Sequence, residues 1–218
     1  MATSKAETKI MKLEKRHIEA LAKAESWIFH SDLCPHLELK ELLNNKMTPQ
    51  ERERFRYLFI KIYGLNRGGL TKSFIKKYFD IMFDGSIYKD SGQPDYSRIL
   101  NTLYKFKRKQ GDRSLQFSFV SKLVAIHQQS SPLYDTHVLA FFGVKAPAAT
   151  IDKKIRINWY IDFLDHVRNS YIEWEKDKRL RLLISKIKAR DSRLEQFDTV
   201  RLMDFLVWNV GNKKLLNK

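Results

Sequence analysis

The sequence predicts an all-α protein with two helical lobes. Apolar residues recur at spacings of three and four along nearly the whole chain, which is the period of an amphipathic helix. The period-two alternation that is typical of strands is hard to find. Of 218 residues, 43% are hydrophobic and 12% are aromatic, so the chain can bury a core in one domain or in two joined lobes.

Helix-start and helix-stop residues divide the first half of the chain. A first helix is expected to end before the stretch at 31–35. Thr48 can cap a helix in which Pro49 takes the first position, and the glycines within 64–69 end that helix. The expected helices of this half span residues 6–29, 37–45, 48–63, 70–82 and 96–109.

The second half contains a stop at 110–112 and a linker at 143–150, on either side of a strongly apolar region. Residues 46–144 are expected to form a central helical lobe. Residues 1–45 and 145–218 are expected to form the second lobe, with a cleft between the two. The expected helices of this half span residues 114–127, 135–142, 152–170, 173–190 and 198–210.

The charge balance indicates a polyanionic partner. The chain has 41 Lys and Arg residues against 25 Asp and Glu residues, a formal net charge of +16, and nucleic acid is the first partner to expect. An acidic membrane surface is the alternative, but the basic residues are scattered over several amphipathic segments instead of forming one interfacial helix. Neither an apolar run of about 18 residues nor a secretory signal is found, so we expect a cytoplasmic protein that does not bind membranes. We also expect it to be a monomer.

Cysteine and histidine usage argues against a metal centre. Cys34 is the single cysteine, which excludes an internal disulfide, a cysteine-rich zinc site and a four-cysteine iron–sulfur cluster. The six histidines show no HxxxH spacing. We therefore expect neither a metal nor another cofactor.

Lys122 is an unusual residue because it lies in a segment that is apolar on more than one side. In a helix over 114–127, Lys122 would lie beside Phe119, with Ser118 one turn earlier. Burial favours the neutral, nucleophilic amine, as in Schiff-base lysines. The alternative is a lysine at the edge of the apolar face whose ammonium reaches solvent.

Asp135 stands at a predicted helix start, after a turn that contains Pro132. By itself it reads as an N-cap, whose carboxylate is held ionised by backbone amides and by the helix dipole. Such a carboxylate also suits the stabilisation of positive charge that develops nearby. One residue can serve both roles.

The order of a lysine-bearing helix, a turn with proline and then Asp-Thr-His-Val at 135–138 resembles the helix-hairpin-helix DNA glycosylase superfamily. The resemblance covers about 114–144, and residues 116–121 replace the family's glycine-rich hairpin. The missing iron–sulfur cysteines point to the cluster-free branches, such as the 8-oxoguanine type or divergent bacterial enzymes that act on phage DNA. The resemblance implies a two-lobed helical fold and an active site made of Lys122 and Asp135.

The implied function is excision of a damaged or modified base from double-stranded DNA, in repair or in antiviral defence. After the base is flipped out, Lys122 would attack the sugar C1′ or position water, and Asp135 would stabilise the developing charge. The same lysine would support an abasic-site lyase step. Tyr134, His137 and Ser118 are the candidate pocket residues.

Basic residues near this element are the candidate contacts to DNA phosphates. The alternative for the residues before Lys122 is a solvated helix end that the helix dipole favours. The rival function is a non-catalytic nucleic-acid-binding or adaptor protein that uses the same surfaces. The candidate DNA-binding residues are Lys72, Lys76, Lys105, Lys107, Arg108, Lys109 and Arg113.

Two further features concern the predicted C-terminal helices. Trp159, Trp174 and Trp208 fall at helical spacing with other apolar residues and are expected in the core, as is Trp27. Asp204 lies inside an apolar segment, and an interhelical partner such as an arginine is expected to neutralise it.

Overall fold

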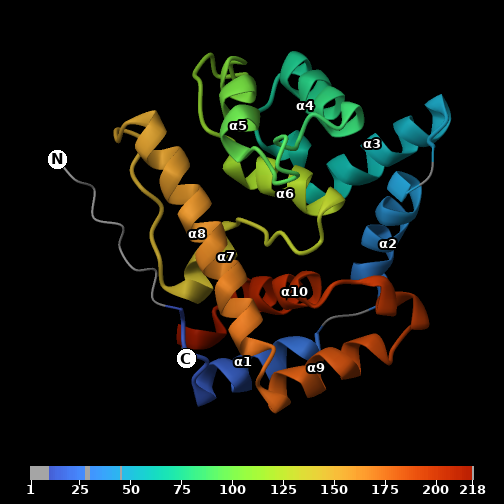
Figure 1. Cartoon of the computed structure of the whole chain (residues 1–218), viewed down its shortest axis with the longest axis vertical. Coiled ribbons are helices and arrows are strands. Elements are labelled where there is room, and N and C mark those ends of the chain that lie inside the picture. The colour runs from blue at the N-terminus through green and yellow to red at the C-terminus, as the bar shows by residue number, and fades with distance from the viewer. Residues whose placement is uncertain (1–9, 28–29, 45, 218) are drawn as a thin grey trace. The chain divides into compact units, whose positions relative to one another are not determined.

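The computed structural model describes residues 10–27, 30–44 and 46–217. These residues form ten α-helices and three short 3-10 segments, and they contain no β-strand (Figure 1). Extended pairing in this part of the chain is confined to two isolated bridges, Leu70 with Arg108 and Tyr88 with Pro94. The all-α prediction is confirmed.

The chain divides into two compact units, which we call the middle unit, residues 29–128, and the terminal unit, residues 1–28 with 129–218. The sequence-based division placed one lobe over 46–144 and the other over 1–45 with 145–218, so its boundaries differ from those of the two units. The helices of the middle unit are α2 (His30–Asn44), α3 (Pro49–Tyr63), α4 (Lys72–Asp84), α5 (Tyr96–Tyr104) and α6 (Phe117–His127), with the 3-10 segment η1 (Leu65–Arg67). Those of the terminal unit are α1 (Lys15–Glu25), α7 (Thr136–Phe142), α8 (Lys153–Trp174), α9 (Lys178–Lys188) and α10 (Thr199–Asn212), with η2 (Ser192–Gln196) and η3 (Leu215–Asn217).

Polar caps set the helix starts in both units. The hydroxyl of Thr48 accepts a hydrogen bond from the Glu51 amide, while the Glu51 carboxylate accepts one from the Thr48 amide, a capping box. This contact lowers the pKa of Glu51, chiefly through the Thr48 backbone amide. Asp95, Asp152 and Asp198 cap α5, α8 and α10 through the same kind of side-chain acceptor.

Several predicted helix boundaries were wrong in the described part; for example, α8 continues to Trp174 instead of ending at 170, and α9 begins at Lys178 instead of 173. The helix α2 begins at His30 and contains Pro35, although the sequence suggested a break over 31–35. Burial of Leu33, Leu37 and Leu39 stabilises this helix despite the proline. The helix α5 ends at Tyr104 instead of continuing to 109, and α1 occupies only Lys15–Glu25. The predicted helix ends at 6–9, 28–29 and 45 lie outside the described residues.

Aromatic rings contact one another in both cores. In the middle unit, Phe59 contacts the rings of Phe55, Tyr78 and Phe79 at centroid distances below 6 Å. In the terminal unit, the rings of Phe142 and Trp174 stack at 5.6 Å with an interplanar angle of 11°. Each unit therefore has a hydrophobic core of its own.

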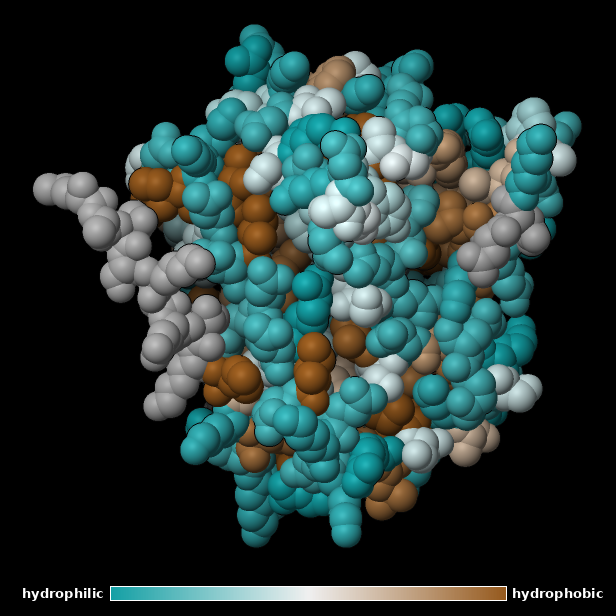
Figure 2. Space-filling view, viewed as in Figure 1, coloured by the Kyte–Doolittle hydropathy of each residue, from teal (hydrophilic) through white to brown (hydrophobic). Residues whose placement is uncertain are grey.

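The surface carries mostly hydrophilic side chains. Figure 2 shows such residues over most of one face, with hydrophobic residues in separate patches. Tyr57, Ile155 and Leu182 are large apolar residues with more than half of their surface exposed. Within the described ranges, no helix combines the length and the apolar content that are needed to cross a membrane.

Gly211 lets α7 pack closely against α10 because it has no side chain. A Cβ atom added at Gly211 would lie 2.0 Å from the carbonyl oxygen of His137, a backbone atom that cannot move alone. We expect Gly211→Ala to lower the free energy of unfolding by about 1–3 kcal/mol, because α7 would have to shift. Urea unfolding followed by circular dichroism measures this loss. Asn212→Ala, at an exposed position of the same turn, should leave the midpoint nearly unchanged.

Candidate active site

The helix α6 is central to the middle unit, as the sequence predicted. Val120, Leu123 and Val124 are fully buried along it. The buried hydroxyl of Tyr78 donates a hydrogen bond of 2.7 Å to the backbone carbonyl of Phe119, which ties α6 to α4. Burial raises the pKa of Tyr78 well above its usual value, so the phenol remains a hydrogen-bond donor. The backbone that carries Lys122 is thus held firmly.

Lys122 is half-buried on this helix. Its Nζ donates a hydrogen bond of 3.1 Å to the Oγ of Ser118, one turn earlier. The same Nζ lies 5.5 Å from the ring centroid of Phe119 and 5.8 Å from that of Tyr63. The predicted neighbours Ser118 and Phe119 are confirmed. An amine beside two aromatic faces is partly shielded from water.

Tyr63 and His36 are site residues that sequence reasoning missed. Tyr63 is the last residue of α3, and Gly64 ends that helix in the left-handed conformation with φ of 67°. The Tyr63 hydroxyl lies 3.2 Å from Nδ1 of His36 on α2, and the two rings meet edge to face. Of this pair from two other helices, Tyr63 lies beside the Lys122 amine, and His36 contacts Tyr63.

The glycine-bearing turn after Tyr63 packs against the aromatic cluster formed by Tyr63 and Phe119 around Lys122. A Cβ atom at Gly68 would come within 2.7 Å of the Phe119 ring, so any larger residue there would require the ring to shift. The carbonyl of Gly69 accepts a hydrogen bond of 2.8 Å from the amide of Lys109. The hydroxyl of Thr71 donates one of 3.2 Å to the carbonyl of Lys107. These bonds tie the basic loop, residues 105–113, to the turn beside Phe119.

The predicted DNA-binding cations differ in their present contacts. Arg108 forms an ion pair with Asp112 that closes its own loop, and Lys76 pairs with Asp80 at 2.9 Å. The remaining members are exposed, and no ion pair involves them within the described part of the chain: Lys72, Lys105, Lys107, Lys109 and Arg113. Five cations of this set are therefore available to an external anion.

Asp135 belongs to the terminal unit and caps α7. Its Oδ1 accepts a hydrogen bond of 3.0 Å from the amide of His137, and the hydroxyl of Thr136 lies 3.4 Å from the same oxygen. The residue is half-buried and has extended backbone angles, as an N-cap requires. The cap that the sequence predicted is present.

The two predicted pocket residues beside Asp135 have different surroundings. Tyr134 is buried against the rings of Tyr160 and Phe163, at 5.0 and 5.9 Å. Burial, followed by the neighbouring Tyr160, raises the pKa of Tyr134 far above its usual value, so its phenol stays protonated. His137 is half-buried, and its ring meets the edge of Trp208 at 5.1 Å.

Trp208 is 38% exposed, so its predicted place in the core was wrong. Trp174 is buried, as predicted, and Trp159 is half-buried and stacks on Phe163. Because the chain around Trp208 is apolar on several sides, helical spacing alone could not show which residue faces outward. The terminal unit thus has an exposed aromatic ring close to α7.

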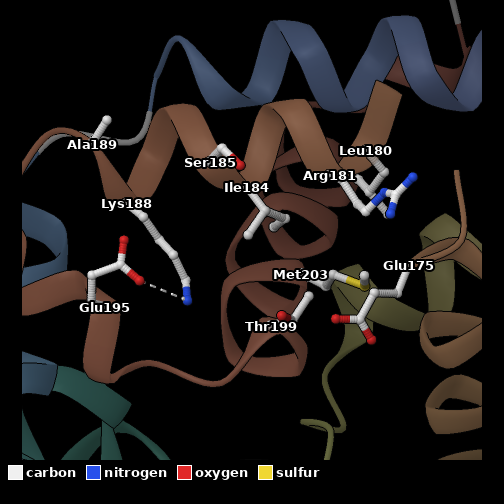
Figure 3. Close-up of a pocket in the computed structure, with 10 residues that line it drawn as sticks. All are labelled: Glu175, Leu180, Arg181, Ile184, Ser185, Lys188, Ala189, Glu195, Thr199 and Met203. Carbon is white, nitrogen blue, oxygen red and sulfur yellow. Dashed lines mark hydrogen bonds and ion pairs between the residues drawn. The ribbon is translucent and has the colours of Figure 1, made fainter. Parts of the chain in front are cut away.

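A pocket of about 390 Å³ opens in the terminal unit between α9, α10 and the end of α8. Figure 3 shows Lys188 paired with Glu195 on its left side, with Arg181 and Glu175 on the right. Ile184 and Met203 form its apolar part. Its charges are balanced, and none of the predicted site residues lines it. The lining of this pocket therefore favours neither an anionic nor a cationic ligand.

The predicted reactive residues belong to different units, Lys122 to the middle unit and Asp135 to the terminal unit. Lys122, Ser118 and the basic loop share one unit, whereas Asp135, Tyr134 and His137 share the other. In comparisons with known proteins, no family model, curated protein or solved structure matches this chain.

Proposed function

We propose that this protein is a DNA glycosylase that excises a modified or damaged base, with Lys122 as the nucleophile. The observation that carries the proposal is the Lys122 amine, held on a buried helix between the rings of Tyr63 and Phe119 with Ser118 as its hydrogen-bond partner. Aromatic faces also suit stacking with a base that has been flipped out of the duplex. The net charge of +16 supports a DNA partner.

In the proposed chemistry, Lys122 attacks in its deprotonated form, because only the amine with a free electron pair is a nucleophile. The bond between the base nitrogen and C1′ breaks, and the electron pair leaves with the base, which takes up a proton. A bond forms between Nζ and C1′, and the amine loses a proton. Asp135 stabilises the positive charge that develops on the sugar. Opening of the sugar ring then gives an imine, from which an abasic-site lyase step can follow.

The test is a screen for base release. Purified protein is incubated with duplexes that each carry one damaged or modified base, and with phage genomes whose DNA contains modified bases. Mass spectrometry of the small-molecule fraction identifies any free base. We expect release of at least one base by the wild type and none by Lys122→Gln. Binding of all these duplexes without release of any base would instead favour a non-catalytic DNA-binding protein.

The basic loop should contribute to DNA affinity without reading the base. We expect the double variant Lys107→Ala/Lys109→Ala to bind every duplex more weakly and to lower the log–log salt slope by about 1–2 units, since each phosphate contact contributes roughly 0.9. Fluorescence anisotropy over a salt series measures the slope. Arg108 is left unchanged because its ion pair with Asp112 closes the loop.

The matched control for this prediction is Lys15→Ala/Lys176→Ala. It removes the same charge from lysines of the terminal unit that already pair with Glu19 and Glu173. We expect a smaller change in slope for this control. Equal slopes for the two double variants would show that the loop acts only through the net charge of the protein.

A further inference from the structure

A buried ion pair on α10 is not used by the proposed chemistry. Arg201 Nη1 lies 2.9 Å from Asp204 Oδ2, and the two side chains are only 5% and 1% exposed. Asp204 was expected to have an interhelical partner such as an arginine, but the arginine that pairs with it lies one turn earlier on the same helix. The pair is therefore local in sequence. Its other contacts join α10 to the turn before Asp135 and to α8.

Both members of the pair bind the backbone of the turn that precedes Asp135. The Leu133 amide donates to both carboxylate oxygens of Asp204, at 3.2 Å each. Arg201 Nη2 donates a hydrogen bond of 3.2 Å to the carbonyl of Ser131. Ser131 and Pro132 are buried under these contacts.

Two further contacts complete the attachment. The buried hydroxyl of Tyr171, on α8, donates a hydrogen bond of 3.2 Å to Asp204 Oδ1. At the start of the turn, the side-chain oxygen of Gln129 accepts a hydrogen bond of 2.8 Å from the amide of Asp198, the N-cap of α10. The turn is thus attached to α10 at 129, 131 and 133.

Stability alone does not explain this arrangement. Burial raises the pKa of Asp204 to about 6, even though Arg201, the Leu133 amide and the Tyr171 hydroxyl all favour the charged carboxylate. Desolvation therefore opposes the ion pair, and hydrophobic side chains of similar volume often give a protein of equal or greater stability. What apolar side chains cannot supply is the hydrogen bonds to Ser131 and Leu133.

We infer that Arg201 and Asp204 are positioning residues that hold the backbone of 131–133 and thereby fix the place of the Asp135 carboxylate. This inference rests on the proposed function, in which Asp135 acts on the sugar. Leu133 is two residues before Asp135, so a shift of the turn moves the carboxylate directly. A displacement of about 1 Å of such a group can lower the rate by roughly 10²-fold.

The experiment compares the wild type with Arg201→Met/Asp204→Leu, which replaces the ion pair by apolar side chains. We expect this variant to remain folded at the assay temperature, with a lowered thermal midpoint because the Ser131 carbonyl, the Leu133 amide and the Tyr171 hydroxyl lose their partners. It should bind DNA within a few-fold, while its single-turnover base release falls by about 10²-fold. Amide hydrogen exchange, followed by NMR, should show that Leu133 exchanges at least roughly tenfold faster. The matched control is Arg190→Met/Glu25→Leu, which removes another ion pair of the terminal unit.

Two results would overturn the inference. One is an unchanged exchange rate of the Leu133 amide in the double variant. The other is faster exchange with the same rate of base release as the wild type. If the double variant fails to fold, Arg201→Lys takes its place, since lysine keeps the charge but cannot bind Asp204 and Ser131 as a planar fork. Absence of base release by the wild type would contradict the proposed function instead, and the exchange measurement would still test the attachment of the turn.

Discussion

Lys122→Gln should abolish base release. Glutamine keeps a polar tip and part of the methylene stem but has no nucleophilic amine, so we expect the single-turnover rate to fall by more than about 10³-fold. DNA binding should stay within a few-fold, because the exposed cations of the basic loop are unchanged. Quenched-flow measurement of base release, with the enzyme in excess over DNA, gives the rate.

The matched control for Lys122→Gln is Lys61→Gln. Lys61 lies on α3 of the same unit, and its side chain is exposed. The control removes the same charge without touching the aromatic cluster, so its rate should remain close to that of the wild type. If Lys122→Gln retains full activity, Lys122 is a structural lysine that covers the rings of Phe119 and Tyr63.

Asp135→Asn should lower the rate by roughly 10²–10³-fold, the usual cost of removing one group that stabilises the charge of a transition state. Asparagine keeps the oxygen that accepts the hydrogen bond from the His137 amide, so the cap of α7 should survive. We therefore expect a thermal midpoint close to that of the wild type. Single-turnover kinetics and differential scanning fluorimetry measure the two quantities on the same samples.

Asp152→Asn is the control for this prediction. Asp152 caps α8 in the same unit through hydrogen bonds from the Lys154 and Ile155 amides. If the carboxylate at 135 acts only as a cap, the two variants should behave alike in both measurements. Loss of base release in Asp135→Asn alone would separate the chemical role from the structural one.

The parts of this structure that were predictable from sequence are those set by local contacts. Thr48 and Asp135 cap helices because their side chains reach amides two or three residues away. Ser118 and Phe119 lie beside Lys122 because helical geometry brings residues three and four apart together. These predictions needed no knowledge of how the helices pack.

The missed features depend on tertiary packing. His36 and Tyr63 reach the Lys122 region from α2 and α3, and nothing local in sequence pairs them with α6. The helix α2 also runs through Pro35 because buried leucines outweigh its helix-breaking tendency. A tyrosine placed immediately before a helix-ending glycine was the available signal for Tyr63, although it did not indicate a partner.

The basic loop shows both kinds of outcome. The loop precedes the Lys122 helix in sequence, which suggested that the two lie close together. In the structure, the turn that binds the loop packs through Gly68 against Phe119 of that helix. Its conformation was not predicted, because the chain leaves the helix after Tyr104 and closes a turn through Arg108 and Asp112. The sequence of such a cation cluster predicts the charge of a partner but not the conformation of the loop.

Imine trapping tests the central claim, that Lys122 attacks the sugar, most directly. The protein is mixed with a duplex that contains one abasic site, sodium borohydride reduces any imine to a stable amine, and proteolysis with mass spectrometry locates the modified residue. We predict one covalent adduct, on Lys122, that is missing in Lys122→Gln and present in Lys61→Gln. The absence of an adduct with the wild type, or an adduct on a different lysine, would contradict the assignment of Lys122 as the nucleophile.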